Sequence, residues 1–243
     1  MNRIMIDLET LGTQPGSIIL SIGAVRFDLT HGITGEFYTN IDVEDSQRHG
    51  LTLTASTVVW WMTQSDEARK ALASAKRPLR DALERFTKWA RPEDFRNAPI
   101  MFPIDELWGN GSDFDNALLA SAYKAAGLGV PWSYRANRCY RTMWSMFPEV
   151  PFEKPATAHN ALEDARAQAI HLQRILLAKG VETEAMKASA ANILSELNLP
   201  AIGDELGLAA GDHIPKHVLS GIKELNARVK ELEVENDKLK ATA

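Results

Sequence analysis

The chain has 243 residues, of which 45% are hydrophobic, which is enough for one sizeable core and an appendage. Its formal charge of −5 is unlike that of a protein held to nucleic acid by a broad basic face, and its single cysteine, Cys139, excludes an intrachain disulfide and a cysteine-rich zinc site. We therefore expect a cytoplasmic protein. Since no run of about 18 apolar residues occurs, we also expect no membrane span.

The predicted elements begin with strands and continue with strands that alternate with helices. The expected strands cover residues 3–8, 17–29, 36–41 and 104–108. The expected helices, which carry apolar residues at a spacing of three or four, cover residues 54–62, 66–75, 78–90, 115–126 and 160–178. In the first of these helices we expect Val58, Trp61 and Met62 on one side. This order of elements predicts an α/β domain over residues 1–180, with a mixed sheet flanked by helices.

The rest of the chain is expected to form two further segments. Residues 181–214 predict a helical and turn-rich extension, and residues 215–243 predict a short coiled-coil helix. The heptad seam of that helix consists of Ile222, Leu225, Val229, Leu232, Asn236 and Leu239. β-branched residues at the a positions and Leu at the d positions favour a parallel homodimer through residues 216–241. The alternative is a terminal helix that packs on its own domain.

Four acidic side chains are candidates for a metal site. Asp7 and Glu9 are two residues apart on the first strand, so both point to one face of the sheet. Asp115 follows a glycine-containing turn, and Asp164 lies one turn into the last helix of the domain. Hard oxygen ligands of this kind suit two divalent ions, Mg²⁺ or Mn²⁺. The ions would offset the negative charge, so an acidic chain can still have a nucleic-acid substrate.

One histidine belongs to the same constellation. His159 is expected on the loop just before the last helix, from which it could reach a bound phosphate and act as a general base. Asp113 competes with Asp115 for the role of the third acid. Carboxylates that hold two ions, with a base beside them, predict a metal-dependent phosphodiester hydrolase.

Three short motifs resemble those of a known enzyme family. Residues 7–10 (Asp-Leu-Glu-Thr), residues 110–115 and residues 159–164 resemble the exonuclease motifs of the DEDDh (DnaQ-like) 3′–5′ exonucleases, which have the ribonuclease H-like fold. The resemblance covers residues 3–178. Residues 57–64 and 108–111 resemble the RNase-T-like 3′-exoribonuclease branch, which includes phage exonucleases.

This resemblance assigns roles by position. It implies that Asp7, Glu9, Asp115 and Asp164 bind the metal ions and that His159 is the general base. The family's Phe-Asp pair falls on Phe114-Asp115, which favours Asp115 over Asp113. The resemblance also implies that Thr10 and Leu11 grip the terminal nucleotide, with Leu11 as an apolar wedge or, alternatively, a core residue. Asn110 is a further candidate for substrate contact, although one extra residue separates it from Phe114.

Other side chains are candidates for holding the nucleic acid. Trp60 could stack on a base, whereas Trp61 fits the core of the predicted helix better. Arg138 lies between Arg135 and Arg141 and could hold backbone phosphates, the alternative being a solvated helix face.

We therefore expect a 3′–5′ exonuclease that acts on single-stranded 3′ ends, with RNA and DNA both open as substrates. One alternative is a catalytically inactive nucleic-acid-binding adaptor that dimerises through its C-terminal zipper. Another is an endonuclease of the wider ribonuclease H-like group.

Overall fold

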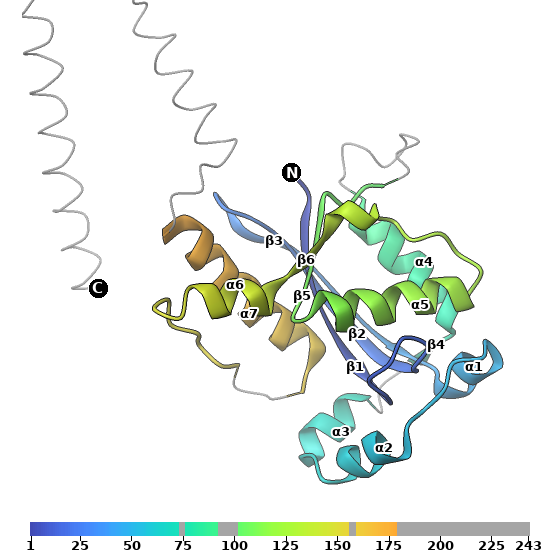
Figure 1. Ribbon diagram of the computed structural model, residues 1–243. Helices are drawn as coiled ribbons and strands as arrows, with labels where there is room; N and C mark the ends of the chain where they lie inside the picture. The colour runs from blue at the N-terminus through green and yellow to red at the C-terminus, as the bar shows by residue number, and fades with distance from the viewer. Residues whose placement is uncertain (73–75, 92–101, 156–158, 179–243) are drawn as a thin grey trace, which may run out of the picture. The chain divides into compact units, whose positions relative to one another are not determined.

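A computed structural model describes residues 1–72, 76–91, 102–155 and 159–178 (Figure 1). These residues form a six-stranded mixed sheet in the order β4-β3-β2-β1-β5-β6. The strands are β1 (Arg3–Thr10), β2 (Ile19–Asp28), β3 (Gly32–Ile41), β4 (Lys76–Arg77), β5 (Glu106–Gly109) and β6 (Asn137–Cys139). The first three strands pair in antiparallel fashion, and the others join in parallel. The predicted mixed sheet is therefore confirmed.

Helices cover both faces of this sheet (Figure 1). The helices are α1 (Val43–Arg48), α2 (Ala55–Met62), α3 (Asp66–Leu72), α4 (Leu79–Ala90), α5 (Ala117–Ala125), α6 (Tyr140–Met146) and α7 (Ala161–Ala178), with a π-helical turn (Ser112–Asn116) before α5 and a 3₁₀ turn (Tyr134–Ala136) before β6. Helices α4 and α5 pack on the face that carries Ile4, Ile6 and Leu8. Helices α6 and α7 pack on the opposite face, around Met5 and Val25. Because side chains alternate along β1, this strand contributes residues to two separate cores, one on each face of the sheet.

Helix α2 turns only a narrow side towards the domain. Trp61 is buried, whereas Met62 in the same helix is 69% exposed. Helix α1 and strands β4 and β6 are not indicated by any sequence pattern. Elements of two to six residues are too short to show a period, and neighbouring strands supply the hydrogen bonds of β4 and β6.

The predicted extension at 181–214 and the predicted coiled coil at 215–243 lie outside the described residues, so the homodimer through residues 216–241 stays a prediction. None of the helices in the described part of the chain combines the length and the apolar character that crossing a membrane requires.

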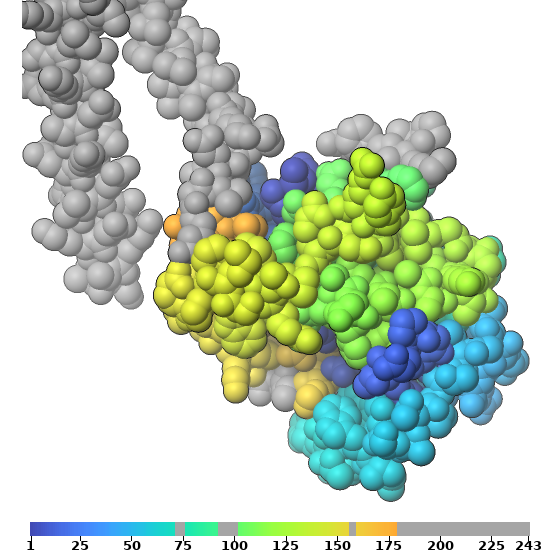
Figure 2. Space-filling model, viewed as in Figure 1, coloured from blue at the N-terminus to red at the C-terminus, as the bar shows by residue number. Residues whose placement is uncertain are grey.

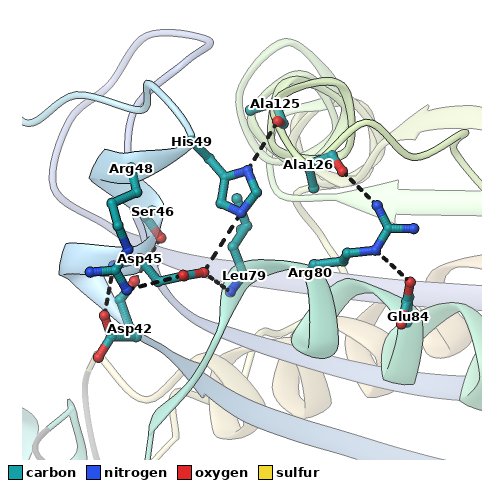
Figure 3. Close-up of polar contacts among 10 residues, drawn as sticks. All are labelled: Asp42, Asp45, Ser46, Arg48, His49, Leu79, Arg80, Glu84, Ala125 and Ala126. Atoms are coloured by element: carbon teal, nitrogen blue, oxygen red, sulfur yellow. Dashed lines mark hydrogen bonds and ion pairs between the residues drawn. The ribbon is translucent and has the colours of Figure 1, made fainter.

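Helix α1 anchors the N-terminus of α4 (Figure 3). Pro78 precedes α4 and has no side chain that could cap it. The backbone N–H of Leu79 instead donates to Asp45 Oδ2 at 2.8 Å. This hydrogen bond holds the pKa of the Asp45 carboxyl below its ordinary value, although partial burial opposes the shift. His49 Nδ1 lies 3.3 Å from the carbonyl oxygen of Ala125, so α1 also contacts the end of α5.

We expect Asp45→Ala to lower the free energy of unfolding by about 1 kcal/mol at neutral pH, the usual cost of a lost helix cap. Because the pKa of Asp45 is lower in the folded protein than in the unfolded chain, its contribution is present above the unfolded pKa. The difference in the free energy of unfolding between wild type and variant should therefore shrink as the pH falls through the pKa that Asp45 has in the folded protein. Urea unfolding at neutral and acidic pH measures it, with the exposed Glu67→Ala as the control.

Candidate metal and nucleotide site

Three carboxylates meet above the sheet. One oxygen from each of Asp7, Glu9 and Asp164 lies within 4.8 Å of the others. Strand β1 supplies the first two on the face covered by α7, whereas Leu8 between them is buried in the opposite core. Helix α7 supplies Asp164 from its first turn. Side chains 157 positions apart in the sequence thus form one cluster with only oxygen ligands, which fits Mg²⁺ or Mn²⁺.

Asp115 completes the acidic group from a third element. It lies in the π-helical turn that follows β5, is 2% exposed, and accepts a hydrogen bond from the Gly111 N–H at 3.1 Å. Its negative charge contributes to the raised pKa of both Asp7 and Glu9, which places it beside them. Asp113 is exposed. The structure therefore brings Asp115, rather than Asp113, to the other three acids.

The start of α7 lies very close to strand β2, which brings this helix to the carboxylate cluster. Gly23 on β2 is the cross-strand partner of Asp7. A Cβ atom on Gly23 would lie 2.1 Å from the carbonyl carbon of Ala161, so only glycine leaves room for the start of α7. Asn160 caps this helix end, because its Oδ1 accepts hydrogen bonds from the N–H groups of Leu162 and Glu163 at 3.1 and 3.3 Å.

His159 lies just before α7, as predicted, and its backbone has a φ of 60°. A left-handed backbone is uncommon for a residue other than glycine and marks a position that the surrounding structure determines. The imidazole ring meets the Trp60 ring edge to face, with 5.0 Å between ring centroids, and Trp61 lies 6.1 Å away. Trp61 is buried and its Nε1–H donates to the carbonyl oxygen of Thr10 at 2.8 Å. Helix α2 therefore orients the histidine beside the acids.

These side chains line a cavity of about 720 Å³. In Figure 2 the yellow segment that contains α6 and the cyan segment that contains α2 both lie on the face of the molecule that is in view. Its described lining consists of Asp7, Leu8, Glu9, Thr10, Thr13, Ser56, Thr57, Trp60, Trp61, Asn110, Phe114, Tyr140, Trp144, Phe152, Lys154, Pro155, His159, Asp164 and Gln168. The cavity has the size of a small-molecule site and combines acidic groups with aromatic walls.

The structure divides the predicted substrate contacts into two groups. Thr10, Trp60 and Asn110 line the cavity, and Trp60 is 42% exposed. Leu11 is not among the described lining residues and packs instead against the core beneath α4 and α5. Arg138 also lies outside that lining, and its Nε is 3.9 Å from Glu106 Oε1. Its Nη1 donates to the carbonyl oxygens of Arg135 and Asn137 at 2.6 and 3.0 Å, so neighbouring groups already engage this guanidinium.

Comparison with known proteins identifies the family. Residues 2–176 match the model of the Rv2179c-like 3′–5′ exoribonuclease domain. The chain belongs to this family. The predicted DEDDh 3′–5′ exonuclease superfamily is thereby confirmed.

Individual relatives of this Rv2179c-like domain are distant. An exodeoxyribonuclease of Enterobacteria phage T4 is 27% identical over 128 residues, which are 49% of this chain and 54% of the phage protein. The chain thus spans about half the length of that relative. Exonuclease I of E. coli, solved with a dT13 oligonucleotide, shares the fold at a TM-score of 0.51 and 15% identity, over 72% of this chain and 41% of that one. The nuclease domain of 3′hExo, a DEDDh family member bound to rAMP, matches at a TM-score of 0.48 and 15% identity, over 74% and 92%.

The acids of the Rv2179c-like site repel one another and are poorly solvated. Burial, followed by the charges of neighbouring acids, raises the pKa of Glu9 to about 8 and the pKa of Asp7 well above its ordinary value. Burial also raises the pKa of Asp115 to about 6 and that of Asp164 above its ordinary value. A site in which the charged form of several carboxylates is disfavoured is a site that bound cations would stabilise.

Without metal, the protein should therefore lose stability as the pH rises. The unfolded chain releases the Glu9 proton near its ordinary pKa of 4.5, whereas the folded protein holds it up to about 8, so unfolding becomes easier across this range. We expect the thermal midpoint in EDTA to be lower at the alkaline end of this range than at the acidic end, and Mg²⁺ to raise it most at the alkaline end. Differential scanning calorimetry tests this, and an equal Mg²⁺ effect at both ends would contradict it.

The sequence analysis missed Gln168. This side chain is 6% exposed, lines the cavity and donates from Nε2 to Asp7 Oδ1 at 2.9 Å. The signal was present in the sequence, because Gln168 lies four residues after Asp164 and so shares its face of α7. A polar residue one turn after a proposed ligand is the kind of group that orients a metal-binding carboxylate.

Proposed function

We propose that this protein is a metal-dependent 3′–5′ exonuclease that removes nucleotides from single-stranded 3′ ends. The proposal rests on the convergence of Asp7, Glu9, Asp164 and His159 on one cavity, with Asp115 buried beside the first two acids. Membership of the Rv2179c-like family and the exonuclease fold support it. The family description specifies RNA and the phage relative is named for DNA, so the proposal includes both RNA and DNA as substrates.

The acidic residues would hold two divalent ions, Mg²⁺ or Mn²⁺. When bound, such ions supply Lewis-acid stabilisation of the charge that develops on a phosphodiester. The chain's own part is to position these ligands. Strand β1 aligns Asp7 and Glu9, the capped start of α7 presents Asp164, and Gln168 fixes the orientation of Asp7.

His159 accepts a proton from the attacking water in this proposal. Its left-handed backbone and its edge-to-face contact with Trp60 direct the imidazole to the cavity. As the proton leaves, the water oxygen forms a bond to phosphorus, and the bond from phosphorus to the 3′ oxygen of the preceding nucleotide breaks. The departing 3′ oxygen takes up a proton from solvent, so the products are a nucleoside 5′-monophosphate and a strand shortened by one residue with a free 3′-hydroxyl. Trp60 and Thr10 line the wall against which the terminal nucleotide would rest.

Digestion of matched oligonucleotides tests the proposal. A 5′-labelled single-stranded RNA and the DNA of the same sequence are incubated with the protein and Mg²⁺ or Mn²⁺. We expect a ladder of products shortened from the 3′ end, no cleavage of a circular single strand, and no reaction in EDTA. Binding without shortening would support the inactive adaptor instead, and cleavage of the circle would support an endonuclease. The ratio of the two ladder rates assigns the preferred sugar.

A further inference from the structure

A second hollow, of about 590 Å³, follows β3 and the exposed side of α4. Residues 34–39 of β3 form one side of it, over a length of about 17 Å at the usual rise per strand residue. The described residues that line the hollow include one acidic side chain, Glu36, and five basic ones, namely Arg26, Arg77, Arg85, Lys88 and Arg91. Positive charge is thus concentrated here on a chain whose formal charge is −5.

The acids around this basic groove already have basic partners. Both carboxylate oxygens of Glu36 accept hydrogen bonds from Arg166, each at 2.9 Å. Asp81 accepts from Arg85 Nε at 2.9 and 3.0 Å and from Arg77 Nη1 at 3.3 Å, so two guanidinium groups share one negative charge. Since Arg77 and Arg85 are also about half exposed, positive charge remains available to an anion from solvent.

The aromatic wall of the basic groove is already occupied. The guanidinium carbon of Arg26 lies 5.2 Å from the centre of the Trp89 ring. The same ring lies 5.6 Å from Phe37 and 5.9 Å from Phe86, measured between ring centroids. These contacts leave Trp89 poorly suited to stack on a nucleobase. The basic groove therefore offers charge rather than base recognition, which is the chemistry of phosphate binding without sequence preference.

The sheet register connects the basic groove with the acidic site. Asp7 pairs with Gly23, and Gly23 pairs with Tyr38, which lines the groove. Tyr38 is therefore two strands, or about 10 Å, from Asp7. The Tyr38 hydroxyl donates to Asn40 Oδ1 at 2.8 Å, and Asn40 is in turn joined through Ser21 to Glu9 by the same register. The backbone of β3 beside the groove is therefore close to the acids, although α4, the other wall of the groove, packs on the opposite face of the sheet.

We propose that the basic groove binds the phosphates of the nucleic-acid strand upstream of its 3′ end. This inference rests on the exonuclease function proposed above. The groove holds a long substrate by charge while nucleotides are removed at the acidic site, so it increases activity on long strands and has no contact with a dinucleotide. An acidic peptide is the competing occupant, and the length of the groove and the polyanionic substrate favour the nucleic acid.

The test compares two double variants. Arg85→Ala with Lys88→Ala removes two charges from the groove, and Lys70→Ala with Lys124→Ala removes two exposed charges elsewhere. All four positions are on helices, where alanine is well tolerated. For each protein, kcat/KM on a twelve-nucleotide strand is divided by kcat/KM on a dinucleotide. We expect the groove variant to lower this ratio about tenfold and to reduce the salt slope of KM by about 1.4, or about 0.7 for each lost phosphate contact. The control variant should match wild type.

Results that differ from these expectations would overturn either the basic groove or the exonuclease function. Equal losses on the long strand and the dinucleotide, or equal effects of the two double variants, refute the basic groove while the exonuclease stands. Tighter binding of an oligoglutamate peptide than of the twelve-nucleotide strand, measured by fluorescence anisotropy in EDTA, would assign the groove to a protein partner. Failure of the wild-type protein to shorten either substrate refutes the exonuclease. The same anisotropy measurement on the two double variants then decides the groove independently.

Discussion

Replacing Asp7 by Asn should lower kcat/KM on a 5′-labelled oligonucleotide by about 10³-fold or more. The amide has the shape of the carboxyl group but removes one of the negative charges that would hold the ions, whose stabilisation of the phosphodiester is worth several kcal/mol. Asp7 is also the carboxylate that Gln168 orients, so no neighbouring acid can replace it in the same place. Initial rates of 3′ shortening in saturating Mg²⁺ measure the effect.

Asp113→Asn is the matched control for Asp7→Asn, because it makes the same chemical change at an exposed acid two residues before Asp115. It should alter kcat/KM less than about twofold. The Asp7 variant should also bind Mn²⁺ more weakly in calorimetry without substrate. In EDTA it should unfold at a higher temperature than wild type, since it relieves a buried repulsion. Retention of more than a tenth of wild-type activity would remove Asp7 from the metal site.

Replacing His159 by Asn should lower kcat by about 10²–10⁴-fold, the usual contribution of a positioned general base. Asparagine is the appropriate replacement because it tolerates the left-handed backbone that His159 adopts, so the start of α7 should keep its place. KM and Mn²⁺ binding should change little, because Asp7, Glu9 and Asp164 stay intact. Single-turnover kinetics separate the chemical step from binding.

His31→Asn is the control for His159→Asn, because His31 also lies in a turn, with a side chain that is 73% exposed. It should change kcat less than about twofold. A His159 variant that keeps more than a tenth of the wild-type kcat would assign the proton transfer to another group.

Much of the fold was predictable because its signals are local. The spacing of Leu79, Leu83 and Phe86 predicted α4, and all three are buried. Helix α7 begins at Ala161, one residue after the predicted start. Short strands could not be predicted because pairing with a distant strand, and not a local pattern, stabilises them. The backbone of β6 pairs with β5, which lies about thirty residues earlier in the chain.

By itself, the sequence determined that Asp7 and Glu9 share a face of one strand, that His159 precedes a helix carrying Asp164, and that these residues follow the motifs of the DEDDh exonucleases. Side chains alternate between the two faces of any strand and recur on one face of any helix every three or four residues. Relations of this kind therefore need no tertiary information. Only the tertiary structure decided that Gln168 orients Asp7, that Arg138 lies outside the described lining of the cavity, and that five basic residues border β3 in the described part of the chain. Those relations depend on which elements pack together, and packing is determined by the shape of the whole core, including the space that Gly23 leaves for α7.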